Sequence, residues 1–264
     1  MKTTFHRLIL TSIAISAAVL SQAGQLIAID SSRALYNVDM ATGAKTLITS
    51  VSANAGTTAG LAYNGATGTM FLTSTSNDSL YTLDFVTGNA TLIGAYGDSA
   101  LVMHGLEWDS STSTLYGSSS HNGGLYTINT TTGAATLIGT SGLSSFQNLV
   151  HNSATNVMYG TNSSADSFYS VDRATGAYTL IGALTGPTNP NGLAFNSDNG
   201  LIYMVDNNTD NLYTINTLTG AATVIGSTGT GNLLGLAYVP DAVPEPATLA
   251  VVALGALLVK RRKK

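Results

Sequence analysis

A fifteen-residue segment occurs five times in the chain and limits the possible fold more than any other feature. The copy at Leu125–Gly139 reads LYTINTTTGAATLIG, and by subtraction the starts of successive copies lie 45, 45, 43 and 44 residues apart. The copies begin at Leu35, Leu80, Leu125, Phe168 and Leu212. A near-constant spacing of this size indicates a repeat architecture, in which each unit is one supersecondary motif.

Each copy predicts a β-hairpin. Two short runs rich in Leu, Ile, Val, Tyr and Thr flank a turn of the form Asp/Asn-x-x-Thr-Gly. The Asp or Asn side chain can accept hydrogen bonds from the backbone N–H groups just ahead of it, and the Gly can adopt the left-handed conformation that closes the turn. We therefore expect five hairpin turns, at residues 39–43, 84–88, 129–133, 172–176 and 216–220.

Two further apolar runs follow each hairpin and complete a four-stranded unit. The first reads Gly-Leu-Ala-Tyr at 60–63 and 235–238, and its variants stand at 105–108, 148–151 and 192–195. The second follows a short turn, at 70–72, 115–117, 158–160 and 202–204, with a counterpart at 26–28. Four-stranded units at this spacing are typical of β-propellers.

The two ends of the repeat region complement each other. The region opens at Gln25 with the second strand of a unit and closes at 234–239 with a first strand. A ring needs such a pairing to hide its sheet edges. We therefore predict an all-β fold, a five-bladed β-propeller of four-stranded blades closed by the C-terminal strand. The expected blades are 234–239 with 25–50, 60–95, 105–140, 148–183 and 192–227. Because neighbouring blades cover one another, runs such as Thr91–Gly94 should be buried on both faces.

The first 23 residues have the pattern of a secretory signal peptide. Lys2 and Arg7 precede an apolar run at 8–20, and the small residues Ser21 and Ala23 place the cleavage after Ala23. This run is shorter than the ~20 residues that a membrane-spanning helix needs. The mature domain is then expected to span 24–241.

The composition of the mature domain excludes several classes of chemistry. The chain has no cysteine, which rules out disulfides and thiolate metal sites. Residues 24–241 contain three basic residues against thirteen acidic ones, a net charge of −10. Such a surface repels phosphate backbones, so no nucleic acid is expected among its partners.

The C-terminal segment carries three features in a fixed order. Val243–Pro246 reads VPEP, the apolar run Ala247–Val259 follows, and Lys260–Lys264 is wholly basic. As a helix the apolar run spans roughly 20 Å at 1.5 Å per residue, which is less than the ~30 Å hydrocarbon core of a bilayer. Its basic end can extend to the cytoplasmic headgroups and hold the segment there.

This segment resembles the PEP-CTERM sorting signal of Gram-negative bacteria, which an exosortase recognises and removes in cells that produce exopolysaccharide. The resemblance implies that Pro244, Glu245 and Pro246 form the sorting motif. It also implies exosortase and the inner membrane as partners, transient anchoring by a C-terminal hydrophobic helix, and release to the cell surface or the extracellular matrix. The repeats are similar to bacterial secreted propeller repeats of the form LYxIDxxTGxxTLIG, which implies a fold only.

Recognised catalytic signatures do not occur in the sequence. The motifs G-x-S-x-G and H-E-x-x-H and the phosphate-binding loops are missing, and the histidines of the mature domain do not stand at a metal-ligand spacing. Residues 206–210 resemble the first half of a calcium loop, but Asn211 and Thr217 stand where such a loop has Gly and Glu. A hairpin turn is the simpler interpretation. We therefore predict no catalytic residue, no metal and no cofactor.

Departures from the repeat provide the candidate site. Glu107 stands at a first-strand position that is Ala or Val in the other blades, and it is the only Glu outside the tail. First strands line the centre of a propeller. With His104, Asn148 and Asn191, near the same end of adjacent strands, Glu107 forms a candidate ligand-binding group. The alternative is a carboxylate solvated by channel water. His151 occupies a position that is aromatic in the other blades, which favours a packing role.

Two classes of function remain open. The first is a non-catalytic module that binds exopolysaccharide or surface proteins, and the alternative is a hydrolase acting on polysaccharide or a lactone. Glycosidases need at least two carboxylates that converge on the substrate. The repeated aspartates are accounted for by turns, which leaves Glu107 and at most Asp98, Asp109 or Asp198. This shortage favours binding over catalysis.

Overall fold

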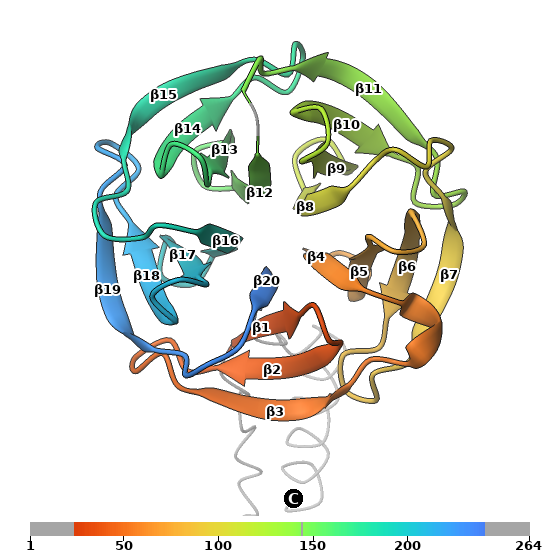
Figure 1. Ribbon diagram of the computed structural model, residues 1–264, viewed down its shortest axis with the longest axis horizontal. Helices are drawn as coiled ribbons and strands as arrows, with labels where there is room; N and C mark the ends of the chain where they lie inside the picture. Colours follow the sequence, from red (N-terminus) through yellow and green to blue (C-terminus); the bar gives the residue numbers. More distant parts are fainter. Residues whose placement is uncertain (1–23, 144, 241–264) are drawn as a thin grey trace, which may run out of the picture. The chain divides into compact units, whose positions relative to one another are not determined.

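Five antiparallel four-stranded sheets form a ring around a central axis, as Figure 1 shows. The computed structural model describes residues 24–143 and 145–240. Within this part of the chain the prediction of a five-bladed β-propeller is confirmed. The predicted signal peptide and C-terminal hydrophobic helix lie outside the described residues.

We number the blades in chain order. Blade 1 holds β20 (Leu233–Val239), β1 (Gln25–Asp30), β2 (Ala34–Val38) and β3 (Lys45–Ser50). Blade 2 holds β4 (Thr58–Asn64), β5 (Thr69–Ser74), β6 (Ser79–Leu83) and β7 (Ala90–Ala95). Blade 3 holds β8 (Met103–Asp109), β9 (Thr114–Ser119), β10 (Gly124–Ile128) and β11 (Ala135–Thr140). Blade 4 holds β12 (Phe146–Asn152), β13 (Val157–Asn162), β14 (Ser167–Val171) and β15 (Tyr178–Ala183). Blade 5 holds β16 (Pro190–Asn196), β17 (Leu201–Asp206), β18 (Asn211–Ile215) and β19 (Ala222–Ser227). A short 3-10 helix spans Ala53–Ala55.

The C-terminal strand closes blade 1, as the complementary ends predicted. Strand β20 lies beside β1 (Figure 1) and pairs with it antiparallel. The register places Leu26 opposite Tyr238 and Ala28 opposite Leu236. The side chains of Leu26–Ile29 are fully buried. The first and last strands of the described chain therefore share one sheet, and the ring has no open blade.

The repeated turns have the predicted chemistry. In blade 1 the carboxylate of Asp39 accepts hydrogen bonds from the backbone N–H groups of Ala41 and Thr42 at 2.8 and 2.9 Å. Gly43 has a φ of 78°, a conformation that a side chain would strain. The equivalent Asp or Asn in the other four turns accepts the same kind of bond. The Asp/Asn-x-x-Thr-Gly pattern is thus explained by the hairpins themselves.

The outermost strands are not buried on both faces, and this expectation was wrong. Leu92 on β7 is 55% exposed, and the side chains at the same position of the other blades are exposed too: Leu47, Leu137, Leu180 and Val224. The outermost strands lie on the rim of the ring, where the blades have diverged (Figure 1). Neighbouring blades therefore cover the inner strands and leave one face of the outer strands in water.

Two glycines of the repeat meet across neighbouring blades. A Cβ on Gly139, the last residue of TLIG in blade 3, would lie 2.1 Å from the backbone oxygen of Thr175 in blade 4. The same contact joins Gly94 to 132–133, Gly182 to 219–220 and Gly226 to 42–43. The glycine of the turn and the glycine that ends TLIG are therefore needed for close packing between blades, in addition to the role of the first in the hairpin.

Substitution of Gly139 should loosen one of these contacts. Gly139→Ala is expected to lower the free energy of unfolding by about 1–3 kcal/mol, because the added methyl group overlaps the Thr175 oxygen and forces the blades apart. Urea unfolding measures the loss. Gly65→Ala is the matched control, since its Cβ would meet no atom nearer than the Tyr63 ring at 3.8 Å. Equal stability of the two variants would contradict a tight contact between the blades.

Candidate functional site

A cavity of about 150 Å³ opens where the five innermost strands end. Its wall repeats equivalent positions of the five blades. One set is the aromatic position near each strand end, occupied by Tyr63, Trp108, His151, Phe195 and Tyr238. The other lies two residues further on, at Gly65, Ser110, Ser153, Ser197 and Pro240. Glu107, Ala194 and Ala237 complete the wall. The cavity therefore arises from the five-fold arrangement of the blades. The residues that differ between blades, such as Glu107, determine its chemical character.

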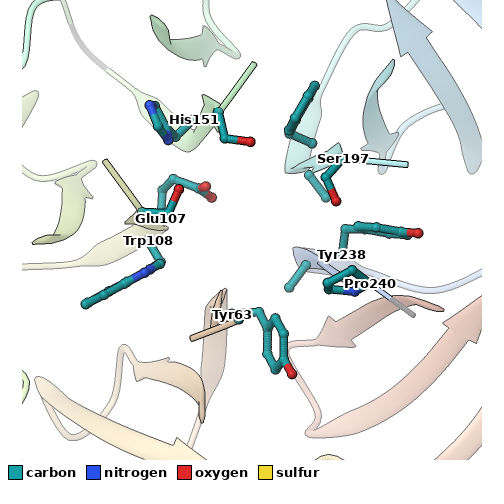
Figure 2. Close-up of a pocket in the computed structure, with 13 residues that line it drawn as sticks. Tyr63, Glu107, Trp108, His151, Ser197, Tyr238 and Pro240 are labelled. Atoms are coloured by element: carbon teal, nitrogen blue, oxygen red, sulfur yellow. The ribbon is translucent and has the colours of Figure 1, made fainter. Parts of the chain in front are cut away.

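The aromatic rings and the carboxylate of this wall point in different directions. Figure 2 shows the rings of Tyr63, Trp108 and Tyr238 turned away from the middle of the cavity, while the carboxylate of Glu107 is directed toward it. Trp108 stacks on Phe71 of blade 2, with the ring centroids 6.1 Å apart. Trp108 therefore packs blade against blade, and the Glu107 carboxylate faces the interior of the cavity.

Glu107 is a carboxylate without a basic side chain beside it. It is the single acidic residue of the cavity wall, which contains no Lys or Arg among the described residues. Its carboxylate accepts a hydrogen bond from the backbone N–H of His151. Burial raises the pKa of Glu107 well above its usual value, and the nearby charge of Asp109 acts in the same direction, while the His151 hydrogen bond opposes them. The site therefore resists ionisation of Glu107.

This environment predicts a pH-dependent effect of Glu107→Gln. Since the pKa of Glu107 is higher in the folded than in the unfolded state, where it is near ~4.3, the wild-type protein loses stability relative to the variant as the pH rises past that value. The variant should therefore be the more stable protein at about pH 7 and lose this advantage toward about pH 4. Urea unfolding at a series of pH values gives the difference. A difference that stays constant with pH would contradict a raised pKa.

The three predicted companions of Glu107 do not line this cavity. His104, Asn148 and Asn191 lie in the first halves of β8, β12 and β16, whereas the cavity is built from the ends of these strands. Asn148 and Asn191 are buried, and the Asn191 amide donates to the backbone oxygen of Asn189 at 2.9 Å. Within the described part of the chain the Asn148 amide nitrogen makes no hydrogen bond. The structure brings Glu107 together with the serine positions instead.

A buried charged network, which no motif of the sequence indicates, lies beside the cavity between blades 3 and 4. The fully buried carboxylate of Asp109 is ion-paired with Arg173 and accepts a hydrogen bond from the Ser111 hydroxyl at 2.6 Å. The His151 ring lies between Asp109, 3.5 Å from its Nδ1, and the Asn156 side chain, 3.1 Å from its Nε2. Arg173 also donates to the Asn156 side chain at 3.0 Å. His151 is therefore packed, as its position in the repeat favoured.

The electrostatics of this network favour an ionised Asp109. Burial alone would raise its pKa, but hydrogen bonds from the hydroxyl and N–H of Ser111 and the proximity of His151 bring the pKa of Asp109 down to about 2. Asp109 and Glu107 lie on the same strand two residues apart, and their surroundings shift their pKa values in opposite directions. Asp109 serves the packing of two blades, whereas Glu107 faces the cavity.

The repeat contains a signal for this network. At the equivalent contact between blades 5 and 1, the amide of Asn196 lies 3.2 Å from the sulfur of Met40. Asp109 stands at the Asn196 position and Arg173 at the Met40 position. The two substitutions occur together at positions that contact each other across adjacent blades. This pairing is the sequence signal for the ion pair of Asp109 and Arg173.

Other features of the sequence are also placed by the structure. Asp206 begins the turn between β17 and β18, where its carboxylate accepts hydrogen bonds from the N–H groups of Asn208 and Thr209 at 3.1 and 2.8 Å. Among the described residues no three His, Cys, Asp or Glu side chains gather in a way that would hold a metal ion. In the same part of the chain no helix has the length and apolarity to cross a membrane.

Comparison with known proteins addresses the tail and the fold separately. Residues 242–264 match the PEP-CTERM protein-sorting motif. This motif implies export and sorting to the cell surface by an exosortase. No curated protein matches the chain. The described domain is thus a five-bladed propeller in a chain that carries a PEP-CTERM sorting motif.

Solved structures resemble the chain at the level of the fold. A chain in the crystal structure of the nidogen/laminin complex is 12% identical, with a TM-score of 0.59 over 82% of this chain and 98% of that one. A protein of unknown function from Bacteroides thetaiotaomicron is 17% identical, with a TM-score of 0.55 over 78% and 58%. Virginiamycin B lyase from Staphylococcus aureus is 12% identical, with a TM-score of 0.50 over 77% and 70%. At these identities the similarity establishes the fold alone.

Proposed function

We propose that the protein is an exported, non-catalytic binding module of the cell surface, and that its cavity receives the end group of an exopolysaccharide chain. In this proposal residues 1–23 are removed after Ala23, residues 24–241 form the mature propeller, and the tail at 242–264 directs the chain to the exosortase. The sorting motif supports export to the cell surface. The propeller supports a binding role, and the nidogen/laminin complex contains a chain of similar fold.

One observation carries the choice of ligand: a single carboxylate faces a small cavity with hydroxyl groups at its mouth. Ser110 and Ser153 are exposed at the cavity opening, and within the described residues their hydroxyls make no hydrogen bond to the protein. The volume of about 150 Å³ is below the range of roughly 300–1,000 Å³ found for drug-sized ligands. A polyhydroxylated end group of a chain suits such a site better than the middle of a long polymer.

The same geometry argues against the hydrolase alternative. Hydrolysis of a glycosidic bond needs two carboxyl groups on either side of it. The acid nearest to Glu107 along the strand, Asp109, is fully buried and paired with Arg173. Asp198, near the opposite wall, accepts a hydrogen bond from the Tyr238 hydroxyl. Within the described part of the chain these two acids therefore do not supply Glu107 with a second catalytic carboxylate, and we favour binding.

A glycan-array screen with a parallel hydrolysis assay tests the proposal. The wild-type protein should bind a restricted set of glycans and release no reducing ends from them. Glu107→Ala should lose this binding, while Asp98→Ala, which removes an exposed carboxylate outside the cavity wall, should keep it. Turnover of any bound glycan would favour the hydrolase. Binding that survives in a folded Glu107→Ala protein would exclude the cavity as the site.

A further inference from the structure

We propose that the end group bound in the cavity carries a protonated amine, as an unacetylated amino sugar does, and that this amine pairs with the carboxylate of Glu107. The inference rests on the proposed function and names its ligand class. It follows from a carboxylate that faces the cavity, while the described residues of the cavity wall include no Lys or Arg.

None of the three basic side chains of the mature domain is among the described residues of the cavity wall. Lys45 donates to the backbone oxygens of Gly229 and Thr230 at 3.3 and 2.7 Å. Arg173 is paired with the buried Asp109. Arg33 lies in the turn between β1 and β2 and is not part of the cavity wall. These are the three basic residues of 24–241, so no Lys or Arg of the described chain is available to neutralise Glu107.

The groups that face Glu107 from the neighbouring strand do not supply a positive charge either. His151 on β12 presents its backbone N–H to the carboxylate, while its ring contacts Asp109 and Asn156. The other titratable groups of the wall are the hydroxyls of Tyr63 and Tyr238, whose rings point away from the cavity. The nearest charged group on its own strand is Asp109, which is negative. Among the described residues of the cavity wall, Glu107 thus has no Lys or Arg as a partner.

A cationic end group of the ligand would stabilise the ionised carboxylate of Glu107. A partly buried carboxylate without a cationic partner is destabilised in its ionised form, and an ammonium group that forms a charge-assisted hydrogen bond to it regains much of that free energy. An ammonium group also brings its own donors, which match the two carboxylate oxygens. The net charge of −10 on 24–241 draws such a ligand toward the protein. A neutral sugar would gain from neither effect.

The pairing has a pH signature. Binding of an ammonium group requires ionised Glu107, so the affinity should rise as the pH increases through the raised pKa of this residue and remain high while the amine keeps its proton. The pKa of Asp109 at about 2 keeps that neighbour ionised over this whole range. Neutral sugars should show the opposite trend or none.

Isothermal titration of the exported protein with two matched probes tests the inference. Chitosan oligosaccharides carry free amines, and chitin oligosaccharides of the same length carry neutral acetamides. The wild-type protein should bind the amine form about tenfold or more tightly than the acetylated form. Glu107→Gln should lose this preference and melt at least as high as the wild-type protein. Asp98→Asn should retain the preference, because Asp98 is an exposed carboxyl group outside the cavity wall.

The outcomes separate the inference from the function on which it rests. Equal affinity of wild-type protein for both probes, or a preference for the amine that persists in Glu107→Gln, would overturn the inference. Glu107-dependent binding of an amine-free glycan in the array would also overturn it, but would leave the proposed function standing. If neither the probes nor any glycan of the array binds, the proposed function fails as well.

Discussion

Removal of residues 232–240 is expected to prevent the formation of a stable ring. The deletion removes β20, which pairs with β1 and contacts β16 and β4 on either side. It removes the buried side chains of Leu233, Leu236 and Tyr238, each of which contributes about 1.5–3 kcal/mol. That sum is comparable to the entire stability of a typical domain, which is about 5–15 kcal/mol. The truncated protein should aggregate or melt without cooperativity.

Near-ultraviolet circular dichroism and thermal melting measure this outcome, and a peptide provides its control. Addition of a synthetic peptide of residues 232–240 should restore cooperative melting, because the peptide can occupy the vacant edge of β1. A peptide of the same composition in scrambled order should not. A truncated protein that remains soluble, with an unchanged melting temperature, would show that the closing strand is dispensable.

The second large effect concerns Arg173. Arg173→Met should lower the free energy of unfolding by about 3–5 kcal/mol, because the substitution leaves the fully buried carboxylate of Asp109 without its cation. Arg173 itself is partly exposed, with 22% of its side-chain area accessible, so the lower end of this range is expected. Urea unfolding at neutral pH measures the loss.

The ring supplies the matched control for this substitution. The double variant Asp109→Asn/Arg173→Met reproduces the pair of Asn196 and Met40 that joins blades 5 and 1. It buries no unpaired charge, so it should recover most of the stability lost by Arg173→Met. A double variant as unstable as the single one would show that the charge of Asp109 is not the cause.

The fold followed from the sequence because its determinants are local and repeated. Turns such as Asp39–Gly43 carry their own hydrogen-bond acceptor and their own glycine, so each hairpin is predicted within fifteen residues. Closure of the ring by the strand at 234–239 was predicted because the first unit lacks one strand and the C-terminal end has one strand in excess. The exposure of Leu92 could not be predicted in this way. It depends on the distance between blades at the rim of the closed ring, and the residue pattern of a single strand does not contain that distance.

The residues of the cavity wall could be predicted only in part, and a ligand-binding role for Glu107 stays a prediction. Glu107 was found because one blade departs from the repeat, but His104 lies three residues earlier, roughly 10 Å along a strand that rises ~3.3 Å per residue. His104 and Glu107 are close in sequence but therefore lie near opposite ends of strand β8. Ser110 and Ser153 were missed because they look like ordinary turn residues, and their approach to one another depends on the ring. The pair of Asp109 and Arg173 joins residues of two different repeats.

The most direct test of the binding proposal uses Trp108, the single tryptophan of the chain, which lies in the cavity wall beside Glu107. Its fluorescence can be followed while exopolysaccharide fractions from the host are titrated into the protein. We expect a saturable change for the wild-type protein and none for a Glu107→Ala protein that melts at least as high. A saturable change that survives in Glu107→Ala, or a wild-type signal that no fraction alters, would contradict a ligand site at the centre of the propeller.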